Sequence, residues 1–194
     1  MKIQNIGFSA LVLAISFTAV ADDQYYVGID SFVVGQNNER AEDTETIDSN
    51  TSSDAGGGAI TIGKRYADND RFEVGFTKVE AEFDGGRSEK FEGIDFDWTF
   101  SILEKNVVQP YLEAGFGLYE YKGTEELTSD NKNLGGIAIN FGAGVIYEAA
   151  KNVELDASYS IKGIGWEEAE FENGDSAKLK EDIGKLVLGA RFLF

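Results

Sequence analysis

The residues of this 194-residue chain that could perform chemistry are mostly acidic. There are 35 aspartates and glutamates against 17 lysines and arginines, and neither histidine nor cysteine. The lack of histidine removes the commonest general base, most catalytic zinc sites and every Ser-His hydrolase. The lack of cysteine removes disulfides and thiolate metal sites. The net charge of −18 argues against a nucleic-acid-binding protein, which needs a basic surface.

Asp95 and Asp97 form the pattern closest to a catalytic one. Alternate side chains of a strand share a face, so both carboxylates would face the same space, as the two carboxylates of a glycosidase do. No acid–base partner accompanies them, so we interpret them as structural charges on an inward-facing surface and not as catalytic groups. We therefore predict no catalytic residue, no metal site and no cofactor.

Strands must position these side chains, because apolar and polar residues alternate with a period of two. In Ile94–Ile102, one face is wholly apolar or aromatic and the other carries Asp95, Asp97, Thr99 and Ser101. Similar runs of about ten residues, the length that a tilted membrane strand needs, bring the expected number of strands to eight. These runs are Tyr25–Val34, Ala59–Tyr66, Arg71–Lys78, Pro110–Tyr121, Ile137–Tyr147, Asn152–Lys162 and Ile183–Phe194.

The connections between these runs alternate between short and long. Tight turns are expected at Ala67–Asp70, Glu104–Asn106 and Glu148–Lys151. Longer loops are expected at Gly35–Gly58, Asp84–Glu92, Lys122–Leu134 and Gly163–Glu181, the first and last of them rich in acidic residues. This alternation predicts an all-β fold, an eight-stranded antiparallel up-and-down transmembrane β-barrel, with both chain ends on the side of the short turns.

The first 21 residues have the pattern of a secretory signal peptide. Lys2 is followed by the apolar stretch Ile6–Val20 and by the small residues of Ala19-Val20-Ala21. This apolar stretch is too short for a membrane-spanning helix. We therefore predict a signal peptide at residues 1–21 and one barrel domain at residues 22–194. The mature chain has no other long apolar run, so it could span a membrane only as a closed barrel.

Three features favour a barrel whose apolar face meets lipid over a secreted soluble barrel of lipocalin type. Glycines crowd the polar face, as the narrow lumen of eight strands requires, and that face carries charges of both signs. Aromatic residues gather at one level, like an interfacial girdle. The glycines are Gly28, Gly63, Gly75, Gly115, Gly117, Gly142, Gly144 and Gly189, and the aromatic residues are Tyr25, Tyr66, Phe72, Tyr147, Phe192 and Phe194.

Parity along the strands predicts a structural cluster of charges in the lumen, near the short turns. Arg191 points inward beside Glu154 and Asp156 of the preceding strand, and Arg65 and Glu73 lie inward at the same level. Acids outnumber bases on the whole inward face. The acids are Asp30, Glu73, Asp95, Asp97, Glu113, Glu154 and Asp156, and the bases are Arg65, Lys162, Lys185 and Arg191.

Several segments resemble strands of the OmpA/OmpX-type outer membrane protein β-barrel domain family, the small barrels often labelled porin-family. These are Tyr25–Gly28, Pro110–Gly117, Phe141–Val145 and the terminal run Leu186–Phe194. The resemblance implies an integral protein of the outer membrane of a Gram-negative bacterium, exported by its signal peptide. It also implies that the barrel-assembly machinery reads Phe192 and Phe194 as an assembly signal.

We expect a non-enzymatic, monomeric barrel with a structural or surface-interaction role, in contact with outer-membrane lipid and lipopolysaccharide. Its acidic loops would share divalent cations or meet a host surface, although they lack an ordered calcium-binding motif. One alternative is a narrow channel that prefers cations, because inward acids outnumber inward bases; eight strands leave little room for it. A more remote alternative is an outer-membrane enzyme, for which the chain lacks a general base.

Overall fold

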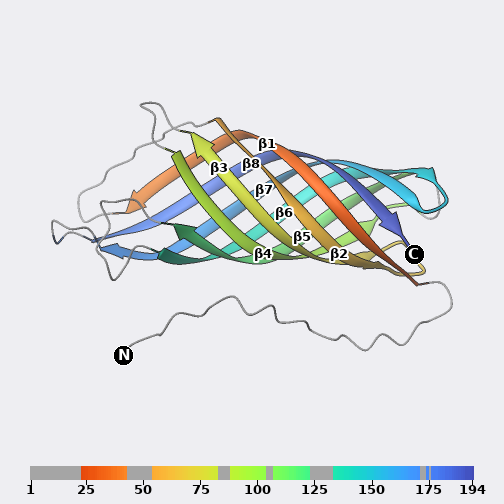
Figure 1. The fold of residues 1–194 in the computed structure, drawn as a ribbon, viewed down its shortest axis with the longest axis horizontal. Coiled ribbons are helices and arrows are strands. Elements are labelled where there is room, and N and C mark those ends of the chain that lie inside the picture. The colour runs from red at the N-terminus through yellow and green to blue at the C-terminus, as the bar shows by residue number, and fades with distance from the viewer. Residues whose placement is uncertain are drawn as a thin grey trace.

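The computed structural model describes residues 23–42, 54–82, 88–103, 107–122, 133–170, 174 and 176–194. Eight strands pair in chain order, each antiparallel to the next, and β8 returns to pair with β1 (Figure 1). The strands are β1 (Gln24–Glu42), β2 (Asp54–Arg65), β3 (Arg71–Glu82), β4 (Ser88–Ser101), β5 (Val108–Lys122), β6 (Asn133–Ala150), β7 (Val153–Glu170) and β8 (Ser176–Leu193). This closed barrel confirms the predicted fold class. The predicted signal peptide, residues 1–21, lies outside the described residues.

Within the described ranges, no helix is long and apolar enough to cross a membrane.

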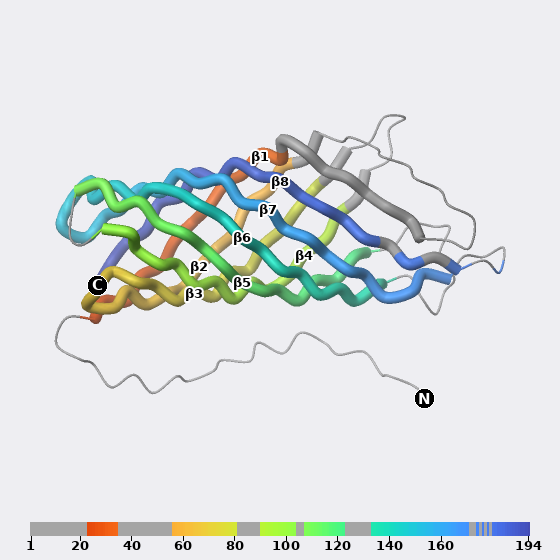
Figure 2. The backbone as a smooth tube through the Cα atoms, turned by 180° about the vertical axis from the view of Figure 1, so that it is seen from behind, coloured from red at the N-terminus to blue at the C-terminus, as the bar shows by residue number. Residues whose placement is uncertain are grey.

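One end of the barrel, here called the turn end, gathers short turns and the end of the chain (Figure 2). At the β2–β3 turn, the Tyr66 amide donates to the Asp70 carbonyl at 2.8 Å, and Asn69 adopts a φ of 68°. Phe194 and Tyr25 exchange two backbone hydrogen bonds there, so the start of β1 and the end of β8 close together. The predicted turn at Glu104–Asn106 lies outside the described residues.

At the opposite end, here called the loop end, the strands run further than the sequence predicted. The expected loop Gly163–Glu181 is mostly strand, because β7 continues to Glu170 and β8 begins at Ser176. Likewise β1 runs on to Glu42, through the first part of the expected loop Gly35–Gly58. These loop boundaries were wrong because the strands continue towards the loop end with charged residues facing outward and apolar residues facing inward, the reverse of the pattern lower in the barrel.

The outward face changes from apolar to charged on the way to the loop end. Phe76, Ile94 and Leu118 are paired neighbours on β3, β4 and β5. Two residues further up, the outward side chains are Lys78 and Glu92, whose charged atoms lie 3.5 Å apart. Glu92 also binds Lys122 of β5, at 3.0 Å. The apolar belt therefore ends at the level of Phe76, and the barrel projects beyond it.

The inward face changes in the opposite sense at the same level. Below it, β3 and β4 point Glu73, Asp95 and Asp97 into the lumen, whereas above it they point Val79 and Phe91 inward, both at most 5% exposed. The loop end is thus built like a water-soluble protein, with apolar residues inside and charges outside. Within the belt, the polarity is inverted, as it is in a barrel surrounded by lipid.

Phe141 lies on the outward face near the middle of the belt stretch of β6 and is 63% exposed. We expect Phe141→Arg to lower the free energy of unfolding in lipid vesicles by about 2–4 kcal/mol, because a cation at mid-belt faces hydrocarbon. As a control, Asn133→Arg places an arginine outward on the same strand but above the belt. It should change the free energy of unfolding by less than about 1 kcal/mol. Urea titrations would measure both. Equal costs for the two substitutions would contradict the proposed position of the belt.

Glycines in the lumen make room for large inward side chains, as predicted. A Cβ atom on Gly63 would lie 2.2 Å from the Tyr26 ring, and one on Gly144 would lie 2.7 Å from the Tyr111 ring. Both tyrosines are at most 3% exposed. Each glycine therefore lets the ring of the tyrosine paired with it on the neighbouring strand lie over its backbone, which contributes to filling the barrel.

Candidate functional site: the filled lumen

The lumen near the turn end is crossed by a network of ion pairs centred on Glu154. Arg65 Nη1 lies 2.7 Å from Glu154 Oε1, and Arg71 Nη1 lies 2.5 Å from Glu154 Oε2. A second nitrogen of Arg71 donates to Glu154 Oε1 at 3.1 Å. Both Arg71 and Glu154 are 1% exposed. Because β2, β3 and β7 supply the three side chains, the network ties opposite walls of the barrel together.

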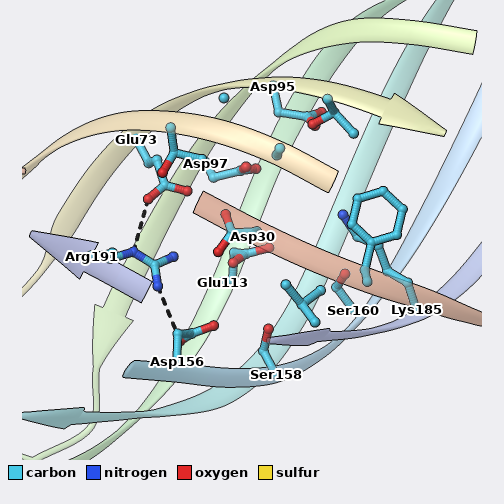
Figure 3. A pocket seen from close by; sticks show the side chains of 16 residues that line it. Asp30, Glu73, Asp95, Asp97, Glu113, Asp156, Ser158, Ser160, Lys185 and Arg191 are labelled. Atoms are coloured by element: carbon cyan, nitrogen blue, oxygen red, sulfur yellow. Dashed lines mark hydrogen bonds and ion pairs between the residues drawn. The ribbon is translucent and has the colours of Figure 1, made fainter. Parts of the chain in front are cut away.

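Arg191 forms a second set of ion pairs in the lumen, with Glu73 and Asp156 (Figure 3). Its Nε donates to Glu73 Oε2 at 3.2 Å, and its Nη1 lies 3.7 Å from Asp156 Oδ2. We call the set Arg65, Arg71, Glu73, Glu154, Asp156 and Arg191 the lower lumen cluster. The structure therefore brings all five predicted cluster residues to one region and adds Arg71.

Two details of the predicted cluster need correction. Arg191 does not pair with Glu154, although the two are directly opposite on β7 and β8; its carboxylate partners are Glu73 and Asp156. The partners of Arg191 depend on contacts across the lumen, and strand parity does not show such contacts. Sequence reasoning also missed Arg71, which shares parity with Glu73 two residues later and could have been found from it.

The carboxylates Asp95 and Asp97 have different partners and do not form an acid–base pair. Lys162 Nζ lies 2.7 Å from each oxygen of Asp95, which also accepts hydrogen bonds from the Tyr119 and Thr77 hydroxyls at 2.7 Å. Asp97 instead accepts a hydrogen bond from the Asn140 amide at 2.6 Å. Asp95 is thus a structural carboxylate in the lumen, bound by Lys162, Tyr119 and Thr77. This is the interpretation that the sequence favoured.

Above Asp95, the lumen is filled by apolar and aromatic side chains. Trp166 of β7 packs edge-on against Phe91 and Tyr121, with ring centroids 5.7 and 5.8 Å apart. We call this region the upper apolar core. It consists of Phe32, Val34, Val79, Phe91, Tyr119, Tyr121, Leu134, Ala138, Ile164, Ala169, Ile183 and Val187, with Trp166 packed against them. The sequence placed Ile164 and Trp166 in a loop, with Phe171; the first two lie in β7, and Phe171 is outside the described residues.

The predicted aromatic girdle and terminal signal lie at the turn end. Lys64 Nζ sits 4.8 Å from the Tyr66 ring centre and 5.9 Å from that of Tyr25. Phe192 and Phe194 point outward and are 49% and 67% exposed. These aromatic side chains lie at the edge of the apolar belt, where a membrane interface would meet them.

Solved structures with the same architecture are small outer-membrane barrels. Neisserial surface protein A is 23% identical over 88% of this chain and 97% of that chain, with a TM-score of 0.60. The outer membrane protein AlkL is 14% identical, with coverages of 92% and 94% and a TM-score of 0.56. OprG from Pseudomonas aeruginosa is 13% identical over 90% of this chain and 96% of that chain, with a TM-score of 0.52. No family model and no curated protein matches the sequence.

The fold, the apolar belt and these similarities define the class of protein. The chain has the fold of an integral outer-membrane β-barrel, of the small eight-stranded kind. Its lumen is occupied at two levels, by the lower lumen cluster and by the upper apolar core.

Proposed function

We propose that the protein is a sealed, non-enzymatic outer-membrane barrel that acts through its loop end, in a structural or surface-interaction role. The observation that carries this proposal is the double filling of the lumen. Eight strands leave an interior only wide enough for side chains, and here ion pairs occupy one level and apolar residues the other. Such an interior offers no path for solutes. The protein would therefore function through its exposed surface at the loop end.

An enzyme is the weaker candidate because three of the buried carboxylates have basic partners that hold them in place. Glu154, Glu73 and Asp95 are each held by arginine or lysine, and the chain contains no histidine to serve as a base. A narrow channel that prefers cations remains the second candidate. It is favoured by the carboxylates around the middle of the lumen and opposed by the upper apolar core.

We further propose that lipid and lipopolysaccharide surround a monomeric barrel and that its loop end meets divalent cations or a host surface. The exposed side chains of the β7–β8 hairpin support this, because they are highly charged. Glu167, Glu168, Glu170 and Asp182 are exposed there together with Lys178 and Lys180. The acidic segment 43–53 lies outside the described residues.

Complementation of a strain that lacks the protein would test the surface role. Wild type should restore resistance to detergent and attachment to a test surface. A variant with residues 43–53 and 123–132 replaced by short glycine-serine linkers should fail in at least one assay while reaching the outer membrane at the wild-type level. Full restoration by this variant would contradict a role for these two segments of the loop end. The double substitution Glu148→Gln/Lys151→Gln, confined to the turn end, is the matched control.

Phe194 is expected to matter for assembly more than for stability. We propose that the barrel-assembly machinery binds its side chain, which is 67% exposed and makes little internal packing. Phe194→Ala keeps the two backbone hydrogen bonds to Tyr25, so the refolded barrel should unfold within about 0.5 kcal/mol of wild type, as surface variants do. Its level in isolated outer membranes should fall. Unchanged membrane levels, measured by quantitative blotting against Leu103→Ala as the control, would oppose the proposal.

A further inference from the structure

Three carboxylates in the middle of the lumen have no cationic partner. Asp30, Asp97 and Glu113 line one chamber of about 40 Å³ (Figure 3). None of the salt bridges found among the described residues includes them. Lys185 also lines the chamber, but its Nζ lies over the Phe32 ring, 4.7 Å from the ring centre. The chamber thus contains more negative charge than its own cations balance.

Asn140 holds two of these carboxylates close to each other. Its amide nitrogen donates to Asp97 Oδ1 at 2.6 Å and to Glu113 Oε1 at 3.3 Å. Two carboxylates that share one donor repel each other when both are ionised. Either a proton or a cation must offset this repulsion.

Buried oxygen atoms without a hydrogen-bond partner surround the same space. Thr61 and Ser160 line the chamber, are 3% and 2% exposed, and have no partner for their hydroxyl oxygens. The Oδ1 atom of Asp30 also lacks a hydrogen bond, and the Oδ2 atom of Asp156 has only the ion pair with Arg191. Buried polar atoms normally have partners, so these oxygens point to a bound species that takes oxygen ligands.

We propose that the chamber binds one hard cation of the calcium class together with a few waters. Hard cations take carboxylate, hydroxyl and water oxygens, and these are the groups present. The volume accommodates about three water-sized species. No three carboxylates of the described residues converge to chelate a metal directly, so water and the hydroxyls of Thr61 and Ser160 complete the shell. The cation would join the walls of the barrel between the lower lumen cluster and the upper apolar core.

This inference goes beyond the proposed surface role and does not depend on it. The test begins with chain unfolded in urea and refolded in detergent at pH 8, in choline chloride with a chelator, so that the chamber starts without Ca²⁺. Parallel samples are refolded with increasing Ca²⁺ at constant ionic strength, so that the ion enters before the lumen closes, and the midpoint of thermal unfolding is followed by tryptophan fluorescence. We expect a saturable rise of about 5–10 °C at 100 times the dissociation constant.

The variant Asp97→Asn/Glu113→Gln should lose this rise, because it removes two of the three unpaired carboxylates. The matched control Asp68→Asn/Glu148→Gln changes two exposed acids at the turn end, outside the chamber, and should keep the rise. A rise of equal size in the chamber variant, or none in wild type, would overturn the proposal. So would an equal rise with Na⁺ at the same concentration, because the charge of the chamber calls for a divalent ion.

Metal content gives a second readout that does not require the variant to fold. After refolding with Ca²⁺ and rapid desalting, atomic emission should find about one calcium per wild-type barrel and per control barrel. Absence of bound calcium in wild type would mean that protons or water alone satisfy the chamber, and this would overturn the proposal.

Discussion

Arg191→Met is expected to lower the free energy of unfolding by about 3–5 kcal/mol, the cost of stranding the partners of a buried charge. Arg191 is 8% exposed and is the cationic partner of both Glu73 and Asp156. Methionine keeps a long apolar side chain in the lumen, so the loss of charge dominates the effect. Urea titration of the refolded barrel in detergent would measure it.

Second substitutions discriminate between the partners. Arg191→Met/Glu73→Gln should recover part of the loss, because it removes one stranded carboxylate. Arg191→Met/Glu154→Gln should recover none, since Glu154 balances Arg65 and Arg71. As an exposed control, Lys90→Met breaks the pair with Glu80 and should cost at most about 1 kcal/mol. A loss of less than about 1 kcal/mol for Arg191→Met itself would contradict a charge-filled lower lumen.

Leu134→Ala is expected to destabilise the barrel by about 2–5 kcal/mol, because it leaves a cavity in the upper apolar core. Leu134 is completely buried although it lies at the loop end of β6. Leu103→Ala removes the same atoms from a side chain that is 48% exposed at the turn end, and it should cost about 0.5 kcal/mol. Similar costs for both, measured by the same urea titrations, would show that the core does not stabilise the loop end.

The fold could be predicted from the sequence because eight runs of alternation are separated by recognisable turns. Alternation identifies the two faces of Ile94–Ile102, and the sharp turn at Ala67–Asp70 fixes one hairpin. Above the belt, the alternation did not identify the strands, because charged residues such as Lys78 point outward there and apolar residues such as Val79 point inward. Because the polarity reverses there, residues that continue the strand had the composition of a loop.

The candidate site was predictable only in part, for a geometric reason. Parity along a strand shows which side chains enter the lumen, and it found Arg65, Glu73, Glu154, Asp156 and Arg191. It does not show which of them meet, because β7 faces β2 and β3 across the barrel and is not paired with either strand in the sheet. The contact between Arg71 and Glu154, separated by 83 residues, needed the closed barrel and its register.

Conductance across a planar lipid bilayer tests the central claim of a sealed lumen most directly. Refolded wild-type barrel should insert without producing current steps in 1 M KCl, because the lower lumen cluster and the upper apolar core both obstruct the interior. Insertion would be verified by the mobility difference between unheated and boiled protein in gels of the same vesicles. Reproducible steps that prefer K⁺ over Cl⁻ would contradict the sealed barrel and would establish the narrow cation channel instead.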